Sequence, residues 1–154
     1  MHERILSQHE CRAVVVTCID FRFAGARTSL AIEKAYGLHE NEYDVIVLPG
    51  GAQNLTQFQL TAEYKGATRH ALGIAIDLHN VRLVIVLSHQ NCGALKAIGK
   101  AFSHEEADVE KEFHRILLLE AAGVVRGEWP RLAIEAGYLY VEESQQIVTI
   151  EKIS

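Results

Sequence analysis

Two short apolar runs set the strongest constraint on the fold of this 154-residue chain. Residues 13–17 read Ala-Val-Val-Val-Thr, and residues 83–87 read Leu-Val-Ile-Val-Leu. Both runs are continuous and rich in β-branched side chains, which is typical of strands buried on both faces of a parallel sheet. Neither run approaches the roughly 20 residues that a membrane span needs. The two runs therefore predict the central strands of an α/β protein.

The rest of the chain alternates between helix-like and strand-like segments. A further strand is predicted at 43–48, and two runs at 138–141 and 147–150 predict a hairpin at a sheet edge. Helices are predicted at 26–36, over most of 56–79 with a break at Gly66, from Gly93, and from Ser103 toward Val125. This alternation predicts a mainly parallel central sheet of order about 2-1-3-4, with flanking helices and a C-terminal antiparallel edge strand. We expect one domain over residues 1–154, with a short N-terminal arm at 1–11.

The composition argues against nucleic-acid and membrane partners. The formal net charge is −5 at pH 7, and no basic tract is present, so general attraction to nucleic acid or anionic membranes is not expected. The N-terminus lacks the apolar core of an export signal. Three cysteines, an odd number, argue against a disulfide framework. We therefore expect a cytoplasmic protein with free thiols.

Three metal-binding side chains follow the two central runs. Cys18 comes directly after the first run, and His89 and Cys92 come just after the second. Ligands of open α/β sheets bind where the carboxyl ends of strands meet the following loops. Thiolate and imidazole are ligands that Zn²⁺ favours over Mg²⁺ or Ca²⁺. If the two strands are neighbours, the three residues form a zinc site with one position open, as catalytic zinc sites have.

Each of these residues also has an ordinary structural interpretation. A single cysteine after a strand is usually a small buried hydrophobic residue, and a single loop histidine is usually solvated. Their joint placement at two neighbouring strand ends favours the metal site. A redox function is disfavoured because the chain has no Cys-x-x-Cys. Cys11 precedes the first strand, at the opposite end of the sheet, and is interpreted as structural.

Asp20 and Arg22 follow Cys18 at two-residue steps. An arginine can hold a carboxylate in a bidentate pair, which keeps the carboxylate ionised and oriented. An aspartate held in this way beside a metal can orient a metal-bound hydroxide, or it can become the fourth ligand. The alternative is a surface ion pair, which contributes little to stability.

The motifs resemble those of a known enzyme family. Residues 18–22, Cys-Ile-Asp-Phe-Arg, resemble the Cys-x-Asp-x-Arg motif of the β-class carbonic anhydrases, and residues 89–93 resemble their His-x-x-Cys-Gly motif. The glycine loop at 48–52 and the C-terminal hairpin are also similar, so the resemblance spans about residues 12–151.

The resemblance implies a zinc enzyme that reversibly hydrates carbon dioxide to bicarbonate by a zinc-bound hydroxide. Zn²⁺ would be held by Cys18, His89 and Cys92. Asp20, held by Arg22, would position the hydroxide or replace it as the fourth ligand. The resemblance further implies a substrate pocket shaped by the glycine loops and a homodimer or higher homo-oligomer. The implied substrate-binding glycines are Gly50, Gly51 and Gly93.

The sequence departs from the family pattern near this site. Phe21 stands where the family usually has a small residue, and Leu48-Pro49 replaces a usual Arg-Asn. These departures leave two alternatives open. One is a zinc hydrolase of another small linear substrate, such as carbon disulfide. The other is a catalytically silent protein of the same fold that binds a small anion or a partner protein.

Overall fold

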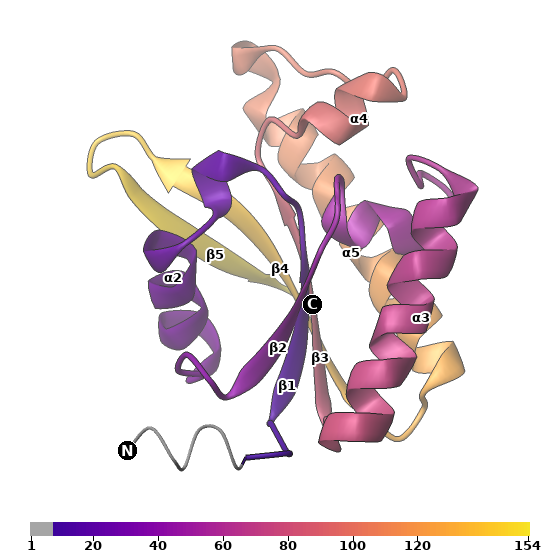
Figure 1. The fold of residues 1–154 in the computed structure, drawn as a ribbon. Coiled ribbons are helices and arrows are strands. Elements are labelled where there is room, and N and C mark those ends of the chain that lie inside the picture. The colour runs from indigo at the N-terminus through magenta and orange to yellow at the C-terminus, as the bar shows by residue number, and fades with distance from the viewer. Residues whose placement is uncertain (1–7) are drawn as a thin grey trace.

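A computed structural model describes residues 8–154, which form a five-stranded sheet with helices on both faces (Figure 1). The strand order is β2-β1-β3-β4-β5. The first four strands are parallel, and β5 runs antiparallel to β4 at the edge. The strands are β1 (Ala13–Thr17), β2 (Tyr43–Val47), β3 (Leu83–His89), β4 (Ala133–Glu142) and β5 (Ile147–Ile153). This confirms the predicted fold class, strand order and antiparallel edge strand.

The helices form two layers, one on each face of the sheet. Helix α2 (Ala26–Tyr36) lies on one face, beside β5. Helices α3 (Ala62–His79) and α5 (Ala107–Glu128) cover the other face, as Figure 1 shows. A short helix, α4 (Gly93–Ala97), follows β3 at the carboxyl end of the sheet.

Burial on both faces explains why the central runs are continuously apolar. Val14 and Val16 of β1 belong to the hydrophobic core under α3 and α5. Ala13 and Val15 of the same strand belong to the core on the other face, which includes Ile32 of α2. Because successive side chains of a strand point to opposite faces, no position of β1 can be polar without burying a polar group.

The register of β1 against β3 places the strand ends together. Val16 of β1 pairs with Val86 of β3 in a parallel ladder. Cys18 therefore leaves β1 at the same edge of the sheet at which His89 ends β3. Both residues reach the carboxyl end, where helix α4 begins.

The structure differs from the sequence prediction in the region of α3. The helix begins at Ala62 and continues unbroken through Gly66, so the predicted break is wrong. Thr61 caps the helix by accepting a hydrogen bond from the Tyr64 amide, 3.1 Å away. A helical glycine costs only about 1 kcal/mol relative to alanine, which the packing of the helix on the sheet outweighs.

The N-terminal segment is described only from residue 8 onward. Of the predicted N-terminal arm, residues 1–7 lie outside the described residues. The described part joins the fold at Cys11, whose amide donates to the carbonyl of His79, 3.1 Å away. Within residues 8–154, no helix combines the length and the apolar character needed to cross a membrane.

Gly137 allows α2 to pack closely on β4. A Cβ at this position would lie 2.6 Å from Cγ2 of Ile150 and would overlap the Tyr36 hydroxyl. Gly137→Ala should therefore lower the free energy of unfolding by about 1–3 kcal/mol, as overpacking of cores does. The matched control is Gly123→Ala in α5, where a Cβ meets nothing within 4 Å. Urea unfolding should show the loss only for Gly137→Ala; equal stability of the two variants would contradict this packing.

Candidate metal centre

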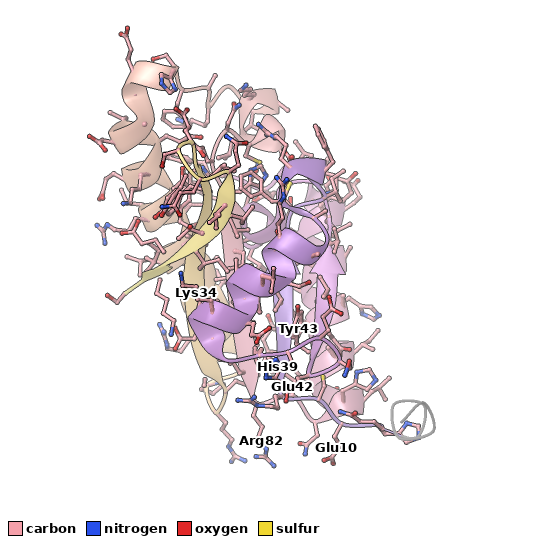
Figure 2. The ribbon with its side chains drawn as sticks, turned by 90° about the vertical axis from the view of Figure 1, so that its left-hand side faces the viewer. Glu10, Lys34, His39, Glu42, Tyr43 and Arg82 are labelled. Atoms are coloured by element: carbon pink, nitrogen blue, oxygen red, sulfur yellow. The ribbon has the colours of Figure 1, made fainter. Side chains whose placement is uncertain are left out.

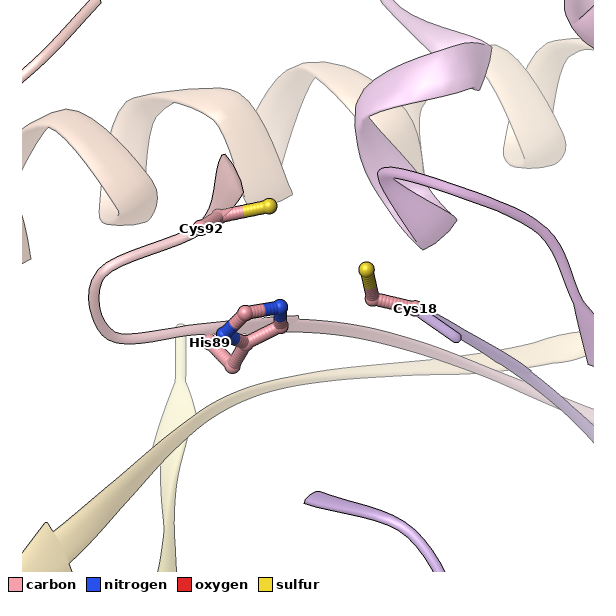
Figure 3. A group of neighbouring side chains, drawn as sticks. All are labelled: Cys18, His89 and Cys92. Atoms are coloured by element: carbon pink, nitrogen blue, oxygen red, sulfur yellow. The ribbon is translucent and has the colours of Figure 1, made fainter. Parts of the chain in front are cut away.

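Cys18, His89 and Cys92 converge at the carboxyl end of the sheet, as predicted from the sequence (Figure 3). One donor atom from each residue lies within 4.8 Å of the other two. The residues are only 7%, 1% and 5% exposed, respectively. Figure 3 shows both sulfur atoms and one ring nitrogen of His89 around a shared space. Three strong metal donors are thus gathered in one buried position.

A tight turn between β3 and α4 brings His89 and Cys92 to the same point. Asn91 adopts a left-handed conformation with φ of 55°, which asparagine tolerates better than most residues. The preceding residue is fixed because the Gln90 amide donates to the Leu139 carbonyl of β4, 2.9 Å away. This turn explains why a spacing of three residues suits one metal ion.

The imidazole of His89 is oriented by its own turn. Nδ1 lies 2.8 Å from the carbonyl oxygen of Gln90. Because a carbonyl only accepts, Nδ1 carries the proton and Nε2 is left as the acceptor. Nε2 is buried and has no hydrogen-bond partner among the described residues. An unpartnered buried polar atom costs about 1–3 kcal/mol. A metal ion at this position removes the cost, and the Nδ1 bond to a carbonyl is the usual orientation of a metal-binding histidine.

The two thiols interact with each other and with a backbone amide. The Gly50 amide donates to Sγ of Cys18 over 3.2 Å. The pKa of Cys18 is lowered, most of all by its hydrogen bond with Cys92, although burial opposes this. The same bond raises the pKa of Cys92. A site that already stabilises one thiolate needs to release only one more proton to bind a divalent ion through both sulfurs. Two thiolates and one imidazole fit a zinc ion.

The loop after β2 packs directly against the end of β1. Gly50 and Gly51 have φ values of 91° and 52°. A Cβ on Gly51 would lie 2.6 Å from the backbone nitrogen of Cys18. A side chain at Gly51 would therefore displace the backbone that carries the Cys18 sulfur. At Gly93, the first residue of α4, φ is not positive and a Cβ would meet nothing within 4 Å, so the local structure does not require glycine there.

Asp20 and Arg22 form a bidentate pair beside the donor atoms. Arg22 Nε donates to Oδ1 of Asp20 over 2.9 Å, and Nη2 donates to Oδ2 over 2.6 Å. The Asp20 Oδ2 atom lies 3.8 Å from Nε2 of His89. The Arg22 side chain lowers the pKa of Asp20 to about 2, although burial opposes this. The carboxylate is therefore ionised at neutral pH and lies at the edge of the donor set.

Arg22 also connects the two loops of the site. Its Nη2 donates to the backbone carbonyl of Asn91 over 2.8 Å. The segment after β1 and the turn after β3 are thus held together by one guanidinium. Such a fixed pair is more than the exposed surface ion pair that the sequence left as an alternative.

Helix α5 contributes two residues that the sequence reasoning missed. Glu110 accepts a 2.5 Å hydrogen bond from the Asn91 amide. His114 is fully buried, with Nδ1 2.8 Å from the Ser88 hydroxyl and Nε2 3.8 Å from Oε1 of Glu110. The available signal was the four-residue spacing of Glu110 and His114, which places both on one helix face.

A cavity of about 460 Å³ opens beside the Arg22 side chain. It is bordered by Phe23 and the Asn91 turn, and both cationic and acidic side chains line it, including Lys96 and Glu110. Phe21 does not enter the interior: it is 86% exposed. The cavity therefore reaches Arg22 and the Asn91 turn, but neither Asp20 nor the three donor residues line it.

Sequence comparison finds relatives but no family assignment. No protein family model matches the chain. An uncharacterized protein of Rickettsia bellii is 27% identical over 132 residues, covering 86% of this chain and 78% of that protein. An uncharacterized protein of Rickettsia conorii is 27% identical over 134 residues, covering 86% and 69%.

Solved structures identify the fold. A carbonic anhydrase from Glaciozyma antarctica superposes with a TM-score of 0.60 at 20% identity, covering 97% of this chain and 88% of that one. A tetrameric β-carbonic anhydrase of Sordaria macrospora gives 0.56 at 10% identity, covering 97% and 85%. A β-carbonic anhydrase of Aspergillus fumigatus gives 0.55 at 13% identity, covering 94% and 91%. The chain therefore has the β-carbonic anhydrase fold.

The hydrogen bond from Asn91 to Glu110 should contribute measurably to stability. Glu110→Ala leaves a part-buried amide without its acceptor, which should lower the free energy of unfolding by about 1–3 kcal/mol. The control is Glu112→Ala on the same helix, where only an exposed ion pair with Arg115 is lost and the change should stay within about 0.5 kcal/mol. Urea unfolding measures both; equal losses would show that the Asn91 contact adds nothing.

Proposed function

We propose that this protein is a zinc-dependent carbonic anhydrase that reversibly hydrates carbon dioxide to bicarbonate. The observation that carries the proposal is the buried Cys18, His89 and Cys92 donor set with an ionised, arginine-held Asp20 at its edge. The β-carbonic anhydrase fold around this set supports it. These three residues would hold the zinc ion through two sulfurs and Nε2 of His89.

A bound zinc ion supplies Lewis acidity that brings the pKa of a water molecule from 15.7 to about 7. The chain supplies the position and the surroundings. Three protein donors leave one position for a small molecule. The apolar core that buries the donors also excludes bulk water from their inner side. The reacting molecules therefore approach from the side of Asp20.

Asp20 positions the reacting water by accepting a hydrogen bond from it. Arg22 occupies both carboxylate oxygens and holds the pKa of Asp20 far below neutrality, so the carboxylate remains an acceptor throughout the working pH range. The bond from Arg22 to the Asn91 carbonyl fixes this acceptor relative to the metal-binding turn. Such positioning is a recognised source of rate enhancement.

The glycines divide into two roles. The amide of Gly50 donates to the Cys18 sulfur, and that of Gly51 donates to the Leu48 carbonyl over 3.0 Å. Because both amides are used within the protein, we propose that these glycines shape the pocket through their missing side chains. The amide of Gly93 begins helix α4, where the first N–H groups have no partner within the helix. We propose that it donates to a substrate oxygen.

We further propose that the chain works as a homodimer or larger homo-oligomer. Ile19 and Phe21, which flank Asp20, are 54% and 86% exposed. Exposed apolar side chains beside a polar site suit burial by a second subunit. The Sordaria macrospora enzymes of this fold are tetrameric.

Asp20→Asn tests the role of the carboxylate. The amide is a poorer acceptor and carries no charge, so the rate of carbon dioxide hydration should fall by about 100-fold or more. Stopped-flow measurement on the zinc-loaded chain gives the rate, and metal analysis should show unchanged zinc content. The control is Asp77→Asn on the exposed face of α3, which should keep full activity.

The same assay separates the competing functions. Hydration by the zinc-loaded wild type that is no faster than in buffer would overturn the proposal. Sulfide release from carbon disulfide by that protein would then support a hydrolase of another linear substrate. Absence of both activities would favour a silent binding protein.

Removal of the metal should abolish activity and destabilise the fold. An ion that binds only the folded site raises the free energy of unfolding. A chelator should therefore lower the urea midpoint, and added Zn²⁺ should restore both the midpoint and the activity. Cys92→Ser should not recover either property. Full activity of chelated, zinc-free protein would contradict a zinc mechanism.

A further inference from the structure

A second group of metal-binding side chains lies at the opposite end of the sheet from the candidate metal centre. Cys11 precedes β1, Asp44 lies near the start of β2, and His79 is the last residue of α3. One donor atom from each lies within 4.8 Å of the other two. The three residues come from three separate elements, and none takes part in the site described above.

The fold holds these three residues in place through backbone as well as side-chain contacts. The Cys11 amide donates to the His79 carbonyl over 3.1 Å, which ties the lead-in of β1 to the end of α3. Nδ1 of His79 lies 2.5 Å from Oδ2 of Asp44. Asp44 is fixed by the pairing of β2 with β1, in which it lies opposite Val14. The positions of Cys11 and Asp44 in the cluster are therefore fixed by backbone contacts of the fold.

The cluster is open to solvent. All three residues are half-buried, and together they line a cavity of about 150 Å³. That volume admits an ion with water. His9 and Glu10 line the same cavity. Figure 2 labels Glu10 and Tyr43, two residues that line this cavity, in the lower half of the molecule.

A catalytic triad of cysteine, histidine and aspartate does not fit the contacts. The Cys11 thiol donates to the Ala13 carbonyl, 3.4 Å away, and no hydrogen bond joins it to His79 among the described residues. In this arrangement the imidazole is not the acceptor of the thiol proton. A thiol, a carboxylate and an imidazole gathered within 4.8 Å instead offer three donors to one divalent ion.

We propose that Cys11, Asp44 and His79 form a second metal site, one that takes a zinc-class divalent cation. Sulfur, nitrogen and carboxylate oxygen together suit Zn²⁺ or Co²⁺, whereas Mg²⁺ and Ca²⁺ prefer oxygen alone. On binding, the Cys11 thiol gives its proton to solvent and its sulfur bonds to the metal. His79 bonds the metal through an unprotonated ring nitrogen, and Asp44 exchanges its hydrogen bond with His79 for a bond to the ion. The ion links the lead-in of β1, the edge strand β2 and helix α3. It acts on the stability of this end of the sheet, away from the reaction.

Cobalt titration of the full-length, metal-free chain tests this site. Co²⁺ bound to thiolate gives a charge-transfer absorption, and equilibrium dialysis gives the stoichiometry. The wild type should bind two equivalents. Cys11→Ser and His79→Asn should each bind one, and excess Mg²⁺ should not compete. The control is His70→Asn, on the exposed face of the same helix, which should keep two.

The outcomes separate this site from the candidate metal centre. Cys18→Ser should also bind one equivalent, and the Cys11→Ser, Cys18→Ser double variant should bind none. A wild type with one equivalent that Cys11→Ser leaves unchanged would overturn the second site. The wild type could also bind one equivalent that is lost in Cys11→Ser and kept in Cys18→Ser. That result would support the second site and overturn zinc binding at the first. Circular dichroism confirms that each variant is folded, and Asp44→Asn replaces any that is not.

Discussion

The parallel pairing of β1 with β3 is the contact on which the rest of the site depends. The two strands are buried on both faces, and their register brings Cys18 and His89 to one edge. A slip of one residue would turn every side chain of β1 to the opposite face. The alternating apolar side chains that fill the two cores therefore also set the position of the metal donors. Packing and chemistry are specified by the same residues.

A chain of charge-assisted hydrogen bonds extends from the donor set to helix α5. Asp20 is held by Arg22, Arg22 by the carbonyl of Asn91, and the amide of Asn91 by Glu110. The backbone carbonyl of Asn91 thus faces the Arg22 guanidinium, and its backbone amide faces the Glu110 carboxylate. These bonds tie the left-handed turn at Asn91 to the segment after β1 and to the long helix α5.

The sequence predicted the features that depend on local pattern. Continuous apolar runs predicted β1 and β3, and the residues that follow them predicted the Cys18, His89 and Cys92 cluster. The two-residue spacing of Asp20 and Arg22 allowed a bidentate pair but left an ordinary surface ion pair open, and the structure shows the bidentate contact. Other features depend on how distant elements pack. Glu110 reaches Asn91 only because α5 crosses that end of the sheet, and Gly66 stays helical because packing outweighs propensity. Cys11 was correctly placed at the far end of the sheet, but only the fold brings Asp44 and His79 beside it.

Because the donor residues are far apart along the chain, they become buried at different stages of folding. His89 and Cys92 lie on one short turn and are close in sequence. The hydrogen bond from Arg22 to Asn91, in contrast, joins residues that are 69 positions apart. Non-local parallel pairing forms slowly, and β1 leaves the ribosome well before β3. The Cys18 thiol is therefore exposed in the nascent chain until β3 docks beside it.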